Sequence, residues 1–304
     1  MKQSVFAREG RWYKGNLHTH TTLSDGKQTP GERVAAYKEK GYDFLAITDH
    51  NVYASYPEFC REDFLVLPAT ERDAVDTSVP CGCVHVLGIS REDEPEKVEK
   101  HLTFTGELGT DGDYQALLDQ VAAAGQLAIL AHPVWSRMTI DHLLQLQGYL
   151  GIEIYNTTCD HRWYTGKCDY MIDSCLRKGK KVLLFATDDC HTADNLDMFG
   201  GWIQVKAKNL THEEILRQIQ AGSFYASTGP EIYDFGLEDG KVYVACSPCA
   251  SINFITYEQL GHSIVGEGLT QGSHQLTGQE TFVRCECVDK FGKIAYTNPI
   301  FLRG

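Results

Sequence analysis

The sequence has no run of about 18 or more apolar residues, the length that a membrane-spanning helix requires. Its beginning, Met1–Gly15, is polar and lacks the apolar stretch of a secretion signal. Neither kind of membrane segment is predicted. We therefore expect a cytoplasmic protein without a membrane partner.

Positive charge is also scarce. The chain has 28 Lys and Arg residues against 41 Asp and Glu residues, which gives a formal net charge of -13. Proteins bind long phosphate backbones mainly through Lys and Arg, so this excess of acid argues against duplex nucleic acid as a partner. A small phosphorylated substrate or a short oligonucleotide stays possible, because metal ions can reverse the sign of the charge locally.

The cysteines do not form the even set of a disulfide framework. There are eleven, scattered over the chain, which favours reduced thiols. Cysteines two apart on a strand share one face, where a thiol commonly packs as a small apolar group. We therefore favour buried thiols over a structural zinc site for the three pairs whose spacing would allow one: Cys81 and Cys83, Cys246 and Cys249, and Cys285 and Cys287.

The length of 304 residues fits one large domain with a small appendage. From residue 12 to about residue 221, short apolar runs alternate with helical patterns, which predicts an α/β fold with a largely parallel sheet. The expected strands are Arg11–His20, Asp43–Asp49, Phe64–Thr70, Cys83–Ile89, Leu127–His132, Gly151–Tyr155, Lys181–Thr187 and Trp202–Ala207. The later helices are expected at Asp113–Ala124, Ile140–Gln147, Tyr164–Lys178 and Thr211–Ala221.

The first helix has clear start and stop signals. Thr29 is suited to the N-cap, Pro30 to the first helical position and Glu32 to the second half of a capping box. Gly41 is suited to the end of the helix.

After Ser223 the pattern changes to short β-type runs separated by Gly, Asp and Ser, which predicts a small antiparallel β domain. We place the two domains at residues 1–225 and 226–304. Arg91–Gly112 has no periodicity and is expected to be a surface insertion beside the site. The C-terminal strands are expected at Lys241–Cys246, Ser251–Thr256, Thr281–Val288 and Ile294–Tyr296.

Residues that can bind metal or orient a ligand end, or directly follow, seven of the expected strands. Loops after parallel strands converge at one end of a barrel, so we expect these side chains to meet. Each has an ordinary explanation, such as a core histidine for His85 or a turn residue for Asp25, but such explanations for all of them together are improbable. The residues at the strand ends are His18, His20, Asp49, His50, Glu71, His85, His132, Glu153, Asn156, Asp188, Asp189 and His191.

The ligand types narrow the chemistry of the predicted site. Imidazole and carboxylate suit Zn, Mn or Fe, and a mixed set of this kind usually leaves positions open for water. A carboxylate such as Glu71 can bridge two ions. A hydrolytic metal site is therefore the first hypothesis.

At these residues the sequence resembles the PHP (polymerase and histidinol phosphatase) family of metal-dependent phosphoesterases. The motifs that carry the resemblance are Asn16–His20 with Asp25, Phe44–Asn51, Glu71, His85–Gly88, Ala131–Pro133, Glu153–Asn156 and Asp189–His191. The segments Ser223–Pro230 and Tyr296–Ile300 look like those of the CehA/McbA-type branch.

The resemblance implies an α/β fold built on a distorted seven-stranded (β/α)7 barrel of PHP type, with two or three divalent metal ions. It implies that Glu71, Asp189 and His191 serve catalysis. A metal-bridging hydroxide would attack the phosphorus of a small phosphomonoester, nucleotide or short oligonucleotide. The implied ligands are His18, His20, Glu71 and Asp189 for one ion, Glu71, His85 and His132 for a second, and Asp25, His50 and His191 for a third.

Other residues have expected supporting roles. Asn156, His161 and Arg162 are candidates for substrate contacts, and His161 or Arg162 for the acid that protonates the leaving group. Asp49 and Asp188 are expected to orient imidazoles, and Cys190 to point away from the site.

Two other functions are compatible with the sequence. One is hydrolysis of a carbamate or carboxylic ester, since metal hydroxide also attacks a carbonyl. The other is a non-catalytic metal-binding or assembly module. The sequence does not indicate an oligomeric state.

Overall fold

The computed structural model describes residues 2–75, 83–94, 96–104, 114–194, 196–257 and 260–303. The helices are α1 Pro30–Glu39, α2 Tyr114–Ala123, α3 Ile140–Gln145, α4 Thr157–Trp163, α5 Asp169–Arg177 and α6 His212–Gln220, with a 3-10 turn at Pro57–Phe59. The strands up to residue 207 are β1 Gln3–Ser4, β2 Arg11–Asn16, β3 Phe44–Ala46, β4 Val52–Ser55, β5 Leu65–Leu67, β6 Ala69–Val75, β7 Cys83–Ser90, β8 Val98–His101, β9 Gln126–Leu130, β10 Tyr149–Asn156, β11 Leu183–Thr187 and β12 Trp202–Ala207. The later strands are β13 Phe224–Ser227, β14 Ile232–Glu238, β15 Lys241–Thr256, β16 His262–Gln275, β17 Phe282–Val288, β18 Ile294–Thr297 and β19 Ile300–Phe301.

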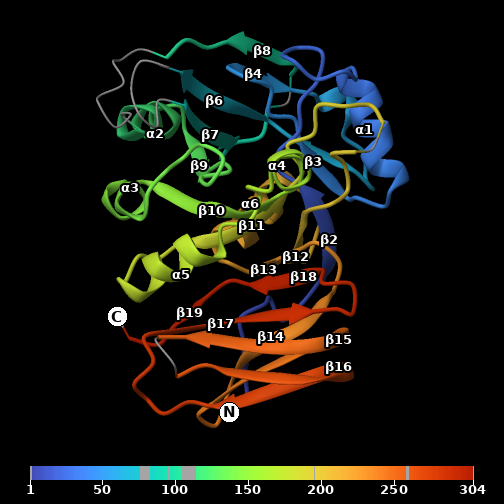
Figure 1. Cartoon of the computed structure of the whole chain (residues 1–304). Helices are drawn as coiled ribbons and strands as arrows, with labels where there is room; N and C mark the ends of the chain where they lie inside the picture. The colour runs from blue at the N-terminus through green and yellow to red at the C-terminus, as the bar shows by residue number, and fades with distance from the viewer. Residues whose placement is uncertain are drawn as a thin grey trace.

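The strands form two sheets, which confirms the predicted mixture of α and β structure. One sheet has the order β11-β10-β9-β7-β6-β4-β8, and the other runs from β5, β3 and β2 through β12 and β13 into the C-terminal strands. In Figure 1 the C-terminal strands, in orange and red, lie at the bottom with both chain ends, and β4, β6, β7 and β8 lie at the top. None of the described helices is both long and apolar enough to span a membrane.

The prediction of a largely parallel sheet is wrong around β7. The pairs β2–β3, β9–β10 and β10–β11 are parallel, but β7 is antiparallel to both β6 and β9. Only residues 76–82 separate β6 from β7, which is too short for the crossover of about a dozen or more residues that parallel neighbours need. The start of β7, not its end, therefore lies beside the ends of β6 and β9.

Two isolated bridges connect the sheets near the expected site. Thr19 pairs with Cys190 beyond the ends of β2 and β11, and His50 pairs with Glu71 of β6. Among the described residues, the hydrogen-bonded strands therefore do not form a continuous closed barrel. At two places only a single bridge links one sheet to the other.

The first helix begins as predicted, but one later helix was predicted wrongly. Thr29 Oγ1 accepts from the backbone of Glu32 and the Glu32 carboxylate accepts from the backbone of Thr29, while Gly41 follows with a φ of +74°. The helix expected over 164–178 begins later, as α5 at Asp169, and an unpredicted helix, α4, precedes it. Asn156 caps α4, which starts at residue 157, and Tyr164 ends it with a φ of +56°.

Three further expectations need correction. The first expected strand stops at Asn16, so His18 and His20 lie beyond β2. Within Arg91–Gly112, Val98–His101 forms β8 and pairs with β4, whereas residues 95 and 105–113 lie outside the described residues. Two expected C-terminal strands are one strand, β15, because register shifts between Ala245 and Ser251 absorb the residues between them.

The predicted domain boundary falls inside β13. This strand pairs with β12 on one side and with β18 on the other, so a single sheet passes from the first part of the chain into the last. The division at residues 225 and 226 stays a prediction.

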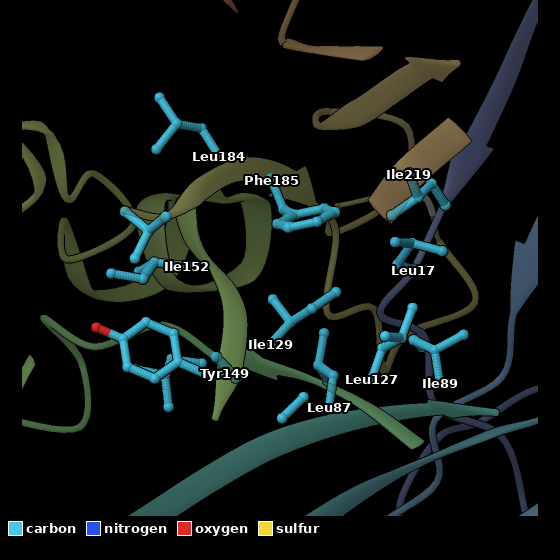
Figure 2. Close-up of a cluster of buried hydrophobic side chains, with 14 of the residues drawn as sticks. Leu17, Leu87, Ile89, Leu127, Ile129, Tyr149, Ile152, Leu184, Phe185 and Ile219 are labelled. Atoms are coloured by element: carbon cyan, nitrogen blue, oxygen red, sulfur yellow. The ribbon is translucent and has the colours of Figure 1, made fainter. Parts of the chain in front are cut away.

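A large apolar core supports the backbone next to the expected site (Figure 2). It includes Leu17, Leu87, Ile129, Ile152 and Phe185, all fully or almost fully buried. Leu17 directly precedes His18, so the core side chain and the site side chain alternate along the same extended backbone. Packing of Leu17 therefore fixes the direction of His18.

We predict that Arg284→Met lowers the free energy of unfolding by about 3–5 kcal/mol, because breaking a buried ion pair leaves a charge without compensation. Arg284 on β17 is fully buried and donates to Asp173 on α5 at 2.7 and 2.9 Å and to Glu286 at 2.7 Å. Chemical denaturation measures the change. Lys38→Met, which removes the exposed pair with Asp63, is the control and should leave the unfolding midpoint in place.

Candidate metal centre

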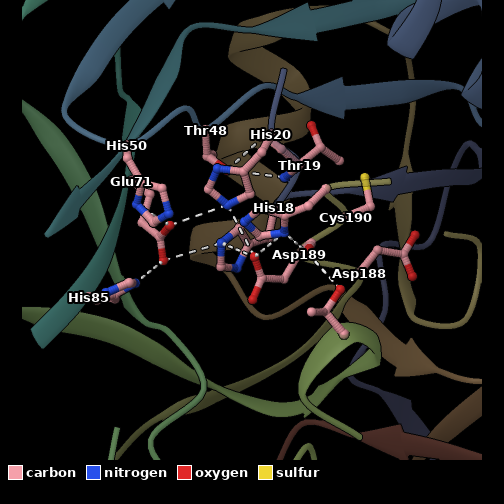
Figure 3. Close-up of polar contacts among 12 residues, drawn as sticks. His18, Thr19, His20, Thr48, His50, Glu71, His85, Asp188, Asp189 and Cys190 are labelled. Carbon is pink, nitrogen blue, oxygen red and sulfur yellow. Dashed lines mark hydrogen bonds and ion pairs between the residues drawn. The ribbon is translucent and has the colours of Figure 1, made fainter. Parts of the chain in front are cut away.

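The first cluster consists of His18, His20, Glu71 and Asp189, all buried (Figure 3). The His18 Nε2 atom lies 3.2 Å from Glu71 Oε1 and 3.2 Å from Asp189 Oδ1. The His20 Nε2 atom lies 3.3 Å from Glu71 Oε2 and 3.1 Å from Asp189 Oδ1. These four residues are the set that the resemblance implied for one ion.

The second cluster consists of His50, His85 and His132, which lie around the Glu71 carboxylate. The Oε1 atom lies 2.9 Å from His85 Nδ1 and 3.3 Å from His132 Nε2, and Oε2 lies 3.0 Å from His50 Nδ1. His85 reaches this place because β7 runs opposite to its neighbours, which brings the start of the strand to the site. The structure thus brings His85 and His132 to Glu71 as expected, and it adds His50 to the same carboxylate.

The third cluster lies nearer the surface. It consists of His20, Asp25, His50 and His191, and the Asp25 side chain is 57% exposed. His191 Nε2 lies 3.4 Å from Asp25 Oδ2, and His20 Nδ1 lies 3.7 Å from Asp25 Oδ1. His20 and His50 each also face Glu71, so this group shares its imidazoles with the other two clusters.

Several buried polar atoms of these clusters lack hydrogen-bond partners, and their spacing suits a shared metal ion. His18 Nε2, His20 Nε2, His50 Nδ1 and Glu71 Oε2 have no hydrogen-bond partner, although buried polar atoms normally have one. Ligand atoms at about 2.1 Å from a tetrahedral ion lie about 3.4 Å apart. The separations of 3.1–3.3 Å in the first cluster are close to that value.

The electrostatics of the clusters lead to the same conclusion. Burial opposes a charge on His20, but Asp189 and Glu71 outweigh it and raise the pKa of His20 to about 9. Burial also opposes ionisation of Glu71 and Asp189, but the surrounding imidazoles hold the pKa of both carboxyl groups well below the usual range. The carboxylates therefore stay ionised and hold positive charge among the imidazoles, which protons or metal ions can supply.

The backbone is strained at two residues of the site. His132 has a φ of +26° and Asp189 a φ of +56°, a region that non-glycine residues rarely occupy. Asp189 is held there by its N–H, which donates to the His18 carbonyl at 2.8 Å, and by its carbonyl, which accepts from Thr158 Oγ1 at 2.7 Å. Strain of this kind is typical of functional sites and leaves no sign in residue spacing.

Glu153 supports the first cluster, a role that the sequence did not assign. The residue is buried, and its Oε1 atom lies 2.7 Å from His18 Nδ1 and accepts from Thr187 Oγ1 at 2.6 Å. Its Oε2 atom accepts from the backbone N–H of His132 at 2.8 Å. The sequence identified Glu153 as a polar residue at a strand end. Only the fold shows that it contacts Nδ1 of His18, the ring nitrogen that faces away from Glu71 and Asp189.

Asp49 and Asp188 do not orient imidazoles directly, contrary to expectation. Asp49 accepts from Thr21 at 2.7 and 2.6 Å and from Ser24 at 2.6 Å, so it shapes the loop after His20. Asp188 accepts from Tyr37, Thr157 and the backbone of residues 199–201. The Cys190 side chain points away from the site as expected and contacts the Tyr37 hydroxyl.

A cavity of about 350 Å³ opens next to the clusters and is lined by candidate ligands including His50, His85, His132, Asp189 and His191. Of the three residues expected to contact substrate, Arg162 lines this cavity. His161 instead contacts the Leu196 carbonyl through Nδ1 at 2.8 Å. Asn156 is fully buried, and its amide donates to Glu153 at 2.9 Å and to Asp189 at 3.2 Å, so its contacts are those of a positioning residue.

The four described cysteines of the C-terminal strands lie apart from these clusters. Cys246, Cys249, Cys285 and Cys287 are buried free thiols in the apolar core of the C-terminal strands. Cys81 lies outside the described residues, and Cys83 has its Sγ 3.4 Å from His85 Nε2. Across the described ranges, the groups suited to a metal ion contain His, Asp and Glu but no cysteine.

Comparison with known proteins supports the resemblance. Residues 16–67 match the family model described as PHP domain. Over 111 residues the chain is 40% identical to the DNA polymerase/3'-5' exonuclease PolX of Bacillus subtilis (strain 168), a stretch that covers 36% of this chain and 18% of that protein. The chain thus spans less than a fifth of the length of this curated relative. The family match covers residues 16–67, and the CehA/McbA branch stays a prediction.

One solved structure shows a shared fold, and a second matches part of the chain. A two-domain protein from Bacteroides vulgatus ATCC 8482, containing a predicted PHP-like metal-dependent phosphoesterase, has a TM-score of 0.51 at 16% identity, with 98% of each chain covered. An amidohydrolase from Chromobacterium violaceum with bound sulfate has a TM-score of 0.42 at 16% identity, covering 69% of this chain and 96% of that one. At this identity the first match shows a shared mixed α/β, two-domain fold.

We predict that Glu153→Gln weakens divalent metal binding about 10–100-fold, because the rear partner of a ligating histidine sets its orientation and basicity. The amide keeps the shape of Glu153 but removes the negative charge beside His18 Nδ1. Competition with a chromophoric chelator measures the affinity. Glu62→Gln, at an exposed loop position, is the matched control, and equal affinities in the two variants would contradict the role assigned to Glu153.

Proposed function

We propose that the protein is a metal-dependent phosphoester hydrolase that acts on a small phosphorylated substrate. The observation that carries the proposal is the meeting of three overlapping imidazole and carboxylate clusters beside one cavity. Arg162 and Lys27 line the same cavity and supply fixed positive charge for a phosphate. The match of residues 16–67 to the PHP domain supports the same chemistry.

The proposed ligand sets follow the sequence motifs and agree with the distances. Divalent ions at these clusters would act as Lewis acids and lower the pKa of bound water. Glu71 Oε1 lies near His18, His85 and His132, and Oε2 lies near His20 and His50. The carboxylate thus contacts imidazoles of both ligand sets and would hold an ion of each. We propose two or three ions of Zn, Mn or Fe, held by His18, His20, Asp25, His50, Glu71, His85, His132, Asp189 and His191.

Within this proposal the protein's own groups have distinct tasks. Glu71 and Asp189 hold the ligand imidazoles in place, and His191 lines the cavity next to Asp25. Arg162 Nη2 lies 3.5 Å from the fully buried Asp197, which keeps the guanidinium at the cavity wall. Arg162 is thus positioned to bind phosphate oxygens.

The distorted PHP-type barrel is part of the same proposal. Strands β2, β3, β6, β7, β9, β10 and β11 would be its seven members, in that order around the ring. The bridges Thr19–Cys190 and His50–Glu71 support this arrangement, since they join the ladders at the two open places. Both bridges contain or adjoin candidate ligands, so ring closure and metal binding would occur in the same segments.

We predict that Glu71→Ala loses bound metal and turnover together, because the substitution removes the carboxylate that five imidazoles approach. Metal content after dialysis and hydrolysis of p-nitrophenyl phosphate are measured on the same samples. His101→Ala, at an exposed position, should keep both. An active Glu71→Ala variant without metal would contradict the proposal.

The reaction class is tested with the metal-loaded wild-type protein on p-nitrophenyl phosphate, its bis-ester and p-nitrophenyl acetate. We expect turnover of at least one phosphoester. Turnover of the acetate alone would replace the proposal with carboxylic ester hydrolysis, and binding of metal without any turnover would support a non-catalytic module.

We predict that Arg162→Ala raises the KM for an anionic phosphoester about 10-fold, the effect of losing one hydrogen bond to a charged group. Steady-state kinetics measure the change. Arg8→Ala, at an exposed N-terminal position, is the control. An unchanged KM in Arg162→Ala would remove this residue from the binding site.

A further inference from the structure

One wall of the cavity is aromatic. Trp135, in the turn after β9, and Trp163, at the end of α4, both line it, with ring centroids 5.9 Å apart. Trp135 packs edge-on against His132 at 4.9 Å and against His85 at 5.5 Å. The aromatic wall therefore starts at the candidate metal ligands and continues away from them.

Trp163 is available to a ligand. Its side chain is 48% exposed, although a large apolar side chain at a helix end is commonly buried. Trp135 and Trp163 are the large apolar side chains of a lining that otherwise consists mainly of candidate ligands, cations and threonines. A ligand made only of phosphate and hydroxyl groups would leave the two tryptophan rings without a matching apolar surface.

The cations lie close to the aromatic rings. Arg162 directly precedes Trp163, and Lys27 reaches the cavity from the loop before α1. The cavity of about 350 Å³ is near the lower end of the roughly 300–1,000 Å³ range of small-ligand sites, so it accommodates one small molecule. The wall thus combines a site for an anion with a flat apolar surface next to it.

From this juxtaposition we infer that the substrate is a phosphomonoester whose alcohol carries an aromatic ring, with the ring against Trp135 and Trp163 and the phosphate toward Arg162 and the metal clusters. The inference rests on the proposed phosphoester hydrolysis and adds the class of the alcohol. Aromatic rings stack on tryptophan without needing a particular hydrogen-bond pattern, so a nucleobase and a simple aryl group share this chemistry.

The test compares pairs of substrates that release similar alcohols but differ in the ring. Benzyl phosphate is compared with propyl phosphate, and adenosine 5'-phosphate with ribose 5-phosphate. For the metal-loaded wild-type protein we expect kcat/KM to be about 10-fold higher for the aromatic member of at least one pair, the scale of one stacking contact. The pair with the larger ratio distinguishes an aryl alcohol from a nucleoside.

The variants locate the preference. Trp163→Ala should lower kcat/KM about 10-fold for the preferred aromatic substrate and by less than about 2-fold for its aliphatic partner. Trp163→Phe should retain most of the preference, because a phenyl ring still stacks. Tyr170→Ala, which removes an exposed aromatic residue of α5 outside the cavity, is the control and should leave both values unchanged.

Binding gives a second readout. Benzylphosphonate, which is not hydrolysed, should quench tryptophan fluorescence of the metal-loaded protein more strongly than propylphosphonate, and Trp163→Ala should reduce the difference. Equal kcat/KM values within both pairs, or equal losses for aromatic and aliphatic esters in Trp163→Ala, would overturn the inference and leave the proposed function standing. Absence of turnover of every phosphoester would instead overturn the proposed function.

Discussion

The rest of the site depends on one constraint. Carboxylates and imidazoles are buried together, and the hydrogen bonds among them are too few to satisfy all their polar atoms. Glu71 is fully buried, and its carboxylate is approached by five imidazoles from different parts of the chain. Several of the facing atoms have no hydrogen-bond partner. Such a cluster is costly unless something positive stands between its members, and a divalent ion meets that need with the ligand types that are present.

Residues and strands outside the ligand set hold the candidate ligands in position. Glu153 contacts His18 and the backbone of His132, and Asn156 links Glu153 to Asp189. The antiparallel course of β7 brings His85 to Glu71, and the two isolated bridges hold the segments after β2 and β3 against β11 and β6. The clusters therefore form only when strands distant in sequence are assembled. We accordingly expect metal binding to stabilise the folded protein.

Much of this could be predicted from the sequence, and the omissions have physical causes. His18 and His20 were predictable because residues two apart in extended backbone share a face, and the start of α1 because its capping box is local. The reversal of β7 was missed, since chain direction depends on the connection and not on the apolar pattern. Helix α4 and its end at Tyr164 were missed, because Tyr164 takes a left-handed conformation that glycine usually occupies. Asn156 was expected at the substrate, but its burial is a tertiary property that spacing does not contain.

Anomalous diffraction from crystals grown with Mn²⁺ shows whether the buried clusters bind divalent ions. We predict an anomalous peak about 2.0–2.2 Å from the ligand atoms of His18, His20, Glu71 and Asp189, with a second peak on the other side of Glu71. A map without anomalous density at these residues, in crystals grown at a high Mn²⁺ concentration, would show that the clusters do not bind divalent ions.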